Sequence, residues 1–175
     1  PLYSQEIHSF LLWMPNWIGD VVLTLPVIQS LRRAYPVARI SVVAKSPSDE
    51  LLMGHPSINT VFTLPSGSEN GFWQKAKFAR NLKKFNFDVG VVFPNSFGSA
   101  FLLSLTEVKC RLGYNTDARE ILLTHPVKTT SRLKKAQYRV EYFFKILSSL
   151  KLDTPDREFA PLISQEGDAT TREVL

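Results

Sequence analysis

Asp20 is the one carboxylate in a segment whose residue types could do chemistry. Residues 13–20 read Trp-Met-Pro-Asn-Trp-Ile-Gly-Asp and follow the apolar run 10–12. A short apolar strand that breaks at Pro-Asn and re-enters a helix is the first strand-to-helix turn of an α/β unit, where such folds bind ligands. A carboxylate held there against a hydroxyl can act as a general base. Aspartate is equally common as a helix N-cap, and the residues alone leave these two interpretations balanced.

A second turn repeats this layout. Residues 94–98 read Pro-Asn-Ser-Phe-Gly and follow the apolar run 88–93, so Asn95 and Ser96 sit where Asn16 sits in the first turn. Arg111 and Arg119 follow. A guanidinium binds phosphate or carboxylate through a planar donor fork, which would suit an acidic ligand. The alternative for these arginines is surface pairing with Asp117 or Glu120.

Other chemistries lack their usual signatures. The three histidines stand far apart, and no histidine, cysteine or carboxylate cluster has ligand spacing, so we expect no catalytic metal. The segment around Ser96 lacks the leading glycine of a nucleophile elbow. The first turn has one glycine, Gly19, and two tryptophans, which disfavours dinucleotide binding, and we expect no bound cofactor.

Strands and helices alternate along the chain. Apolar runs predict strands at 9–14, 39–44, 57–64, 88–93 and 110–114. Helical spacing and capping residues predict helices at 21–35, 46–53, 72–85, 99–105 and 135–150. Pro26 would either kink the first helix or make it start near Thr24 as N-cap. The alternation predicts an α/β, Rossmann-like, doubly wound parallel sheet, with both Pro-Asn turns at the carboxyl edge of the strands.

Composition is that of an ordinary globular protein with an uneven charge. The chain has 175 residues, 44% hydrophobic and 21% charged, and a single cysteine, Cys110. It contains neither a spanning apolar stretch nor a signal-peptide pattern at residues 1–15, and we expect a cytoplasmic protein. Residues 1–150 carry 18 basic and 10 acidic side chains, a net +8, whereas residues 151–175 carry 3 and 6, a net −3. The basic body predicts an anionic partner: nucleic acid, a phosphorylated molecule or a membrane surface.

Several motifs, in order, resemble one family. The segments 15–20, 25–26 and 31–36, then 93–97, 111–114 and Arg119, are similar to the ADP-heptose:lipopolysaccharide heptosyltransferases, particularly heptosyltransferase II. The resemblance implies the N-terminal half of a GT-B enzyme, with two Rossmann-like domains facing a cleft, inversion at the sugar carbon and no catalytic metal.

The resemblance also implies roles for individual residues. Asp20 would deprotonate the acceptor hydroxyl for direct attack on the anomeric carbon of heptose. The expected acceptor-binding residues are Asn16, Trp17, Gly19, Asn95, Ser96, Arg111 and Arg119. The acceptor would be the lipopolysaccharide inner core of the Kdo-lipid A type, whose carboxylates and phosphates would explain a basic cleft.

The expected domains are 1–152, a Rossmann-like acceptor-binding domain, and 153–175, a linker and the start of a donor-binding domain that the chain lacks. ADP-heptose would bind that missing domain, so we expect the 175 residues to be inactive alone. The resemblance further allows peripheral contact with the inner face of the cytoplasmic membrane. We expect no nucleic-acid partner, because the basic residues are dispersed over helices with no recognised motif or repeated aromatic platform. The alternatives are a transferase of the same family with another glycan acceptor, and a noncatalytic domain that binds anionic glycolipid or nucleic acid.

Overall fold

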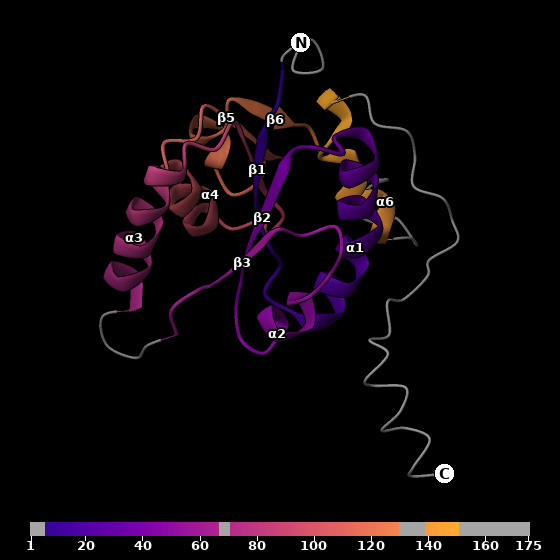
Figure 1. Cartoon of the computed structure of the whole chain (residues 1–175). Helices are drawn as coiled ribbons and strands as arrows, with labels where there is room; N and C mark the ends of the chain where they lie inside the picture. Colours follow the sequence, from indigo (N-terminus) through magenta and orange to yellow (C-terminus); the bar gives the residue numbers. More distant parts are fainter. Residues whose placement is uncertain (1–5, 67–70, 130–138, 151–175) are drawn as a thin grey trace.

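The computed structural model describes residues 6–66, 71–129 and 139–150. Six parallel strands form one sheet in the order β3-β2-β1-β4-β5-β6 (Figure 1). Their bounds are β1 (Ser9–Trp13), β2 (Arg39–Ala44), β3 (Thr60–Thr63), β4 (Val89–Val92), β5 (Cys110–Tyr114) and β6 (His125–Val127). The predicted α/β class and doubly wound parallel sheet are confirmed. The prediction missed β6, and the expected boundary at 152/153 lies outside the described residues.

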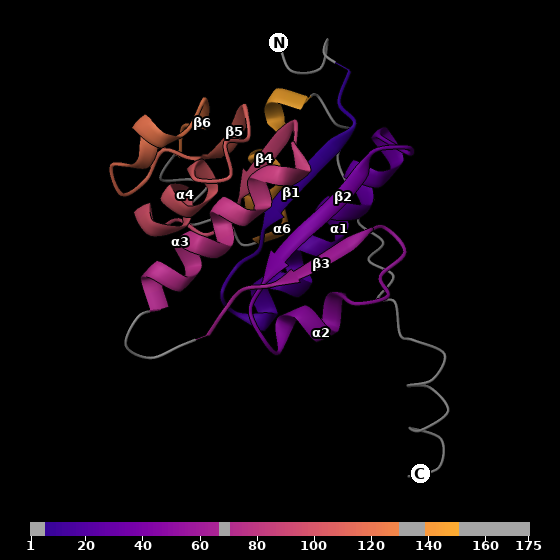
Figure 2. The ribbon, with the colours of Figure 1, turned by 60° about the vertical axis from the view of Figure 1, so that its left-hand side comes forward.

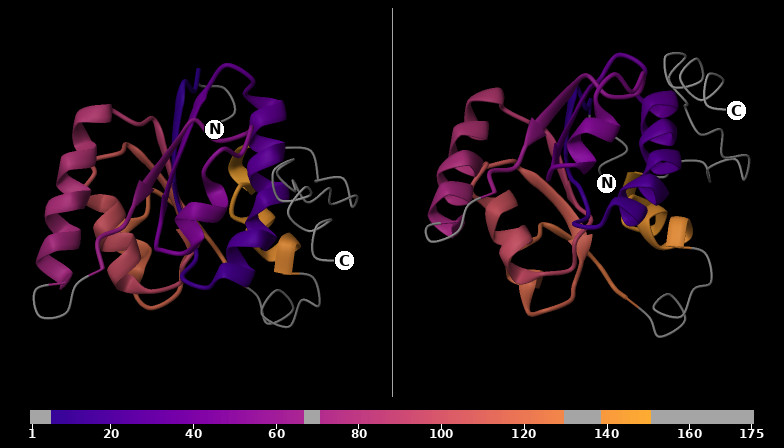
Figure 3. Two further views of the ribbon diagram at one scale, coloured as in Figure 1. Left: turned by 60° about the horizontal axis from the view of Figure 1, so that its bottom comes forward. Right: turned by 90° about the horizontal axis from the view of Figure 1, so that it is seen from below.

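Helices cover both faces of the sheet. They are α1 (Ile18–Ala34), α2 (Ser48–Leu52), α3 (Gly71–Leu82), α4 (Phe97–Ser104) and α6 (Arg139–Lys145), with short 3₁₀ turns at Lys83–Phe85, Arg119–Leu122 and Ser148–Leu150. Figure 3 shows α1 and α6 on one face and α3 and α4 on the other. Each pair of helices packs against a separate apolar cluster on its face of the sheet. The two clusters are separate because successive strand residues, such as Leu11 and Leu12, point to opposite faces.

The sheet's strand order reverses between β1 and β4. These two strands are neighbours, with Trp13 aligned to Val92, although about 75 residues of chain separate them. Both strands are buried along their whole length. In doubly wound sheets the crevice outside the carboxyl ends of such strands is where ligands bind. The chain continues from these ends into the two Pro-Asn turns, so both turns lie at that crevice.

Helix α1 differs from its prediction. It begins at Ile18 and runs as one helix through Pro26 to Ala34, so the prediction of a start near Thr24 is wrong. Thr24 is buried and its hydroxyl donates to the carbonyl of Val21 at 2.6 Å, a bond within the helix that leaves no capping role. The early start places the amino end of α1, with its free amides, directly at the crevice.

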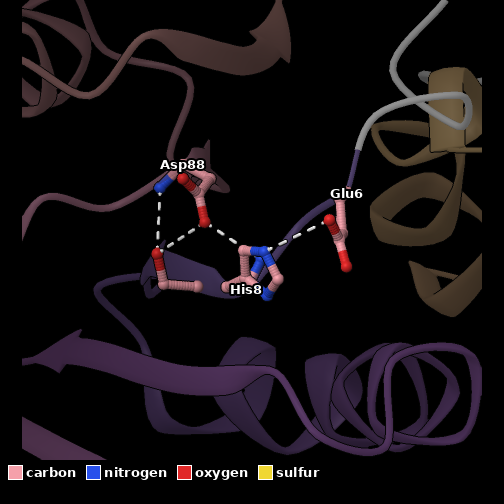
Figure 4. Close-up of polar contacts among 4 residues, drawn as sticks. Glu6, His8 and Asp88 are labelled. Atoms are coloured by element: carbon pink, nitrogen blue, oxygen red, sulfur yellow. Dashed lines mark hydrogen bonds and ion pairs between the residues drawn. The ribbon is translucent and has the colours of Figure 1, made fainter.

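The opposite, amino-terminal edge of the sheet is held by a carboxylate. Asp88 Oδ2 accepts hydrogen bonds from the hydroxyl of Ser9 at 2.9 Å and from the amide of His8 at 3.0 Å (Figure 4). Glu6 lies 3.8 Å from the His8 ring. Asp88 therefore ties the start of β4 to the start of β1 and takes no part in the crevice at the other edge.

Candidate functional site

A pocket of about 170 Å³ lies at the carboxyl ends of β1 and β4. Its walls come from the two Pro-Asn turns, the start of α1 and helix α6, and are formed by Pro15, Asn16, Trp17, Asp20, Phe93, Pro94, Asn95, Ser96, Tyr142 and Phe143. The prediction that the two turns meet at one edge is therefore confirmed. Of the eight predicted site residues, the pocket brings together Asp20, Asn16, Trp17, Asn95 and Ser96.

Asp20 is the third residue of α1 and lines the pocket. The N-cap is Trp17, which makes no side-chain capping bond, so the alternative of Asp20 as the N-cap is wrong. The backbone enters the helix through the bond from the Val21 amide to the Trp17 carbonyl at 3.0 Å. Asp20 thus presents a carboxylate group at the pocket wall.

The turn after β4 places two polar side chains at the pocket. Ser96 is the N-cap of α4, and its hydroxyl oxygen accepts a hydrogen bond from the amide of Ser99 at 3.3 Å. Helix α4 therefore begins at Phe97, two residues before the predicted start. Asn95 is exposed, and its Nδ2 donates to the hydroxyl of Tyr142 at 2.6 Å. This turn reaches across to α6 through that bond.

Arg119 holds the turn after β4 from inside the protein. Its side chain is completely buried. Nε donates to the carbonyl of Tyr114 at 2.6 Å, Nη1 donates to the carbonyl of Pro94, and Nη2 donates to Asn95 Oδ1 at 3.4 Å. Surface pairing of Arg119 with Asp117 or Glu120 is therefore wrong. In this conformation Arg119 has no exposed surface, so the predicted direct contact between Arg119 and an acceptor has no support here and stays a prediction.

The bonds around Arg119 close into a ring that includes α6. The hydroxyl of Tyr114 donates to the carbonyl of Tyr142 at 2.5 Å, and the two tyrosine rings stack with centroids 4.3 Å apart. The ring thus runs from Arg119 through Asn95, Tyr142 and Tyr114 back to Arg119. It fixes the amide of Asn95, whose oxygen faces Arg119, so Asn95 offers a ligand an N–H donor. The donor would suit a carboxylate, phosphate or hydroxyl oxygen.

Burial shifts the pKa values of two members of this ring of hydrogen bonds, Arg119 and Tyr114. Burial lowers the pKa of Arg119 to about 10, against the opposing influence of Tyr142 and Asp117. The arginine therefore stays charged at neutral pH. Burial, reinforced by Tyr142, raises the pKa of the Tyr114 hydroxyl well above its ordinary value. The Tyr114 hydroxyl consequently stays a proton donor, as its bond to the Tyr142 carbonyl requires.

Arg111 does not line the pocket, so its predicted acceptor-binding role has no support at this site and stays a prediction. It is the second residue of β5, aligned with Gly90, toward the amino-terminal part of the sheet. Nε donates to the carbonyl of Leu122 at 2.6 Å and Nη1 to the carbonyl of Val108 at 2.7 Å. Arg111 therefore joins two loops. The predicted strand at 110–114 of a parallel sheet already placed Arg111 near the amino end, away from the crevice, and the structure confirms that position.

Five residues that line the pocket were absent from the predicted set: Pro15, Phe93, Pro94, Tyr142 and Phe143. Tyr142 and Phe143 of α6 line the pocket and belong to the core that α6 forms with α1. Their aromatic character and helical spacing indicate a packed helix face, and this is also what they are. Nothing in the local sequence marks Tyr142 as the partner of Asn95, which lies 47 residues earlier.

Gly19 provides a test of close ligand approach. It is the second residue of α1, does not line the pocket, and a Cβ added to it would meet no atom within 4 Å. We expect Gly19→Ala to raise the free energy of unfolding by about 0.5 kcal/mol, because alanine loses less backbone entropy in a helix. Urea denaturation measures this change. Acceptor affinity should stay within about twofold of the wild type, less than the typical effect of one lost hydrogen bond. A larger loss of affinity would mean that the acceptor approaches the Gly19 backbone closely, as its predicted acceptor-binding role would require.

Taken together, the pocket combines a proton acceptor, Asp20, with an N–H donor on Asn95 and aromatic walls. Such a set can hold a hydroxyl-bearing ligand and remove its proton. Among the residues that the structure describes, no group of three histidine, cysteine or carboxylate side chains could hold a metal ion.

Comparison with known proteins gives a consistent result. Residues 75–174 match the model of glycosyltransferase family 9 (heptosyltransferase). The chain is 30% identical over 110 residues to lipooligosaccharide heptosyltransferase 2 of Haemophilus ducreyi, an alignment covering 62% of this chain and 31% of the relative. It is also 30% identical over 112 residues to lipopolysaccharide heptosyltransferase 2 of Escherichia coli, covering 62% and 32%. The matched part thus spans about a third of the length of these relatives.

Solved structures show the same fold. The structure of Escherichia coli ADP-heptose lipopolysaccharide heptosyltransferase II matches with a TM-score of 0.74 and 23% identity, covering 95% of this chain and 50% of that one. The glycosyltransferase family 9 structure from Veillonella parvula matches with a TM-score of 0.81 and 18% identity, covering 95% and 48%. This chain therefore has the fold of about half of each of these proteins.

Proposed function

The chain belongs to glycosyltransferase family 9, the heptosyltransferase family, and on this premise we propose that it is the acceptor-binding half of a GT-B heptosyltransferase. The enzyme would transfer heptose from ADP-heptose to the inner core of lipopolysaccharide. The observation that carries the proposal is the pocket at the β1/β4 crevice, which Asp20 and the fixed amide of Asn95 both line. The relatives named above are lipopolysaccharide and lipooligosaccharide heptosyltransferases, which supports this choice of substrate class.

In the proposed reaction, Asp20 takes the proton of the acceptor hydroxyl as the hydroxyl oxygen bonds to the anomeric carbon of heptose. The bond from that carbon to the diphosphate breaks, and its electron pair leaves with ADP. Attack from the face opposite the diphosphate inverts the sugar carbon. Asn95 and Asn16 would hold oxygen atoms of the acceptor, while Trp17 and Tyr142 would shape the pocket.

The donor side of the reaction is assigned to a second domain. ADP-heptose would bind the part of the relatives that this chain does not cover, and the described residues would contribute the acceptor and the base. We place the reaction in the cytoplasm at the inner face of the cytoplasmic membrane. A transferase of the same family with another glycan acceptor is the alternative for the substrate, and a noncatalytic binder of anionic glycolipid or nucleic acid is the alternative for the class.

Acceptor binding by the chain itself tests the proposal without a donor domain. We expect a deacylated, Kdo-containing core fragment to bind in isothermal titration calorimetry and to shift the NMR signals of Asn16, Asn95 and Ser96. Asn95→Ala should weaken binding roughly three- to tenfold, the effect of one lost hydrogen bond. Asn81→Ala changes an exposed asparagine outside this pocket and serves as the matched control. Unchanged affinity in Asn95→Ala, or tighter binding of duplex DNA than of the core fragment, would contradict the proposal.

A further inference from the structure

Four aromatic rings gather at the amino ends of α3 and α4. Phe72 stacks on Phe101 with centroids 5.9 Å apart, and Phe97 stacks on the same ring at 6.5 Å. Trp73 lies edge-on to Phe72 at 6.0 Å. Despite these contacts, Trp73 is 68% exposed, Phe72 51% and Phe97 43%. The cluster is therefore an apolar surface that the described protein leaves open to solvent.

A basic stripe continues from this cluster along α3. Trp73, Lys77 and Arg80 follow one another at intervals of four and three residues, which places them on one side of α3, and Lys84 follows in the 3₁₀ turn Lys83–Phe85. All four are exposed. The opposite side, with Ala76, packs into the core. The outward side of α3 is thus aromatic at its amino end and positive along the rest.

The positive charge of the stripe is not neutralised locally. Residues 71–87 contain five basic side chains and no acidic one. Within the described part of the chain, Lys83 is the member of this segment that has a carboxylate partner, Glu107 at 2.7 Å. The exposed cations Lys77, Arg80 and Lys84 therefore face solvent with their charge available to a partner.

The aromatic cluster lies beside the candidate site. Helices that follow parallel strands start at the carboxyl edge of the sheet, and α4 starts at the pocket, because Ser96 lines the pocket and Phe97 is the next residue. Helix α3 packs alongside α4 on the same face of the sheet (Figure 2). The open aromatic surface and the pocket thus share one edge of the molecule.

We propose that the outward side of α3, together with the aromatic cluster, docks on a lipid bilayer with anionic headgroups. Tryptophan and phenylalanine favour the headgroup boundary, and lysine and arginine are attracted by the negative surface potential. Protein interfaces are depleted of lysine, which disfavours a protein partner for this stripe. The proposed contact is made by one helix side lying on the bilayer surface. No helix of the described residues is long and apolar enough to span a bilayer.

This inference rests on the proposed function and deepens it, because it names the surface that would bring the pocket to a lipid-anchored acceptor. An acceptor anchored in the bilayer by its lipid would stand beside the surface on which α3 docks. Docking would hold the pocket near the headgroups, so the sugar part of the acceptor reaches Asp20 without leaving the membrane. A water-soluble acceptor would gain nothing from the same surface.

Vesicle flotation with the complete chain tests the docking directly. We expect binding to phosphatidylcholine vesicles that contain phosphatidylglycerol and much weaker binding to pure phosphatidylcholine. The triple variant Lys77→Gln, Arg80→Gln, Lys84→Gln should lower the partition coefficient about a hundredfold, since each basic residue near such a surface contributes about fivefold. The control is the triple variant Arg33→Gln, Lys109→Gln, Lys128→Gln, which removes the same charge from exposed positions elsewhere and should bind nearly as the wild type.

Two results would overturn the docking surface: equal binding of both triple variants, or wild-type binding to duplex DNA but not to anionic vesicles. A second readout separates this inference from the proposed function. In an enzyme that also contains a donor domain, the α3 variant should slow transfer to a vesicle-anchored acceptor and leave transfer to the deacylated acceptor unchanged. Absence of transfer to both acceptors in the wild type would refute the proposed function, whereas flotation would still decide the docking.

Discussion

Asp20→Asn is expected to lower the turnover number of heptose transfer by roughly 10²- to 10⁴-fold, the usual contribution of a positioned general base. The amide keeps the size of the side chain but cannot take the acceptor proton. Because Asp20 lies at the pocket wall in the first turn of α1, the acceptor should still bind, and the loss should appear in kcat and not in the KM for the acceptor. The measurement needs the chain joined to a donor domain, with ADP-heptose and a Kdo-containing acceptor.

A matched variant distinguishes the loss of the general base from the loss of one negative charge. Asp117→Asn makes the same chemical change at an exposed carboxylate outside the pocket, at a left-handed backbone position that asparagine tolerates well. We expect it to turn over as the wild type does. Both variants should unfold within about 1 kcal/mol of the wild type, because a carboxylate near a helix start contributes no more than that through the dipole. Turnover of Asp20→Asn close to that of Asp117→Asn would remove the general base from the proposal.

Arg119→Met is expected to be the most destabilising change near the site, lowering the free energy of unfolding by about 3 kcal/mol. The substitution removes hydrogen bonds from a charged donor and leaves buried carbonyls without a partner, and each of these losses destabilises the folded protein. The carbonyls of Tyr114 and Pro94 would lose Arg119, and the amide of Asn95 would lose the bond that orients it. Urea denaturation measures the stability, and titration with the core fragment should show weaker acceptor binding as well.

Two further variants keep this prediction testable if Arg119→Met does not fold. Tyr142→Phe removes the hydroxyl that accepts from Asn95, and we expect a loss of about 1 kcal/mol with weaker acceptor binding. Arg111→Met removes two bonds to carbonyls far from the pocket, so it should lower stability and leave acceptor affinity unchanged. If Arg111→Met and Tyr142→Phe changed acceptor affinity equally, the ring would not be what positions Asn95.

Much of the fold is predictable from local pattern. The strands at 39–44 and 110–114 have the bounds that their sequences predict. For 39–44 the reason is a largely β-branched run, buried from Ile40 to Ala44, which leaves a continuous signal. β6 was missed since it has three residues, His125 to Val127, with a proline in the middle. Helix α1 was placed too late, because Pro26 suggested a break that the buried, packed helix does not make.

By itself, the sequence determined the chemistry available and the edge of the sheet at which it gathers. Two apolar strands that each end in a Pro-Asn turn must bring those turns to the same edge of a parallel sheet, so the sequence alone places Asp20 and Asn95 at one edge. The strand order, with β1 beside β4, brings both residues to one pocket, and only the structure shows that order. The tertiary structure decided the roles of the two arginines. Arg111 and Arg119 have the same side chain and lie close together in the chain, yet one joins loops and the other is buried behind the pocket. Burial and partners depend on which distant segments pack together, and local sequence does not contain that information.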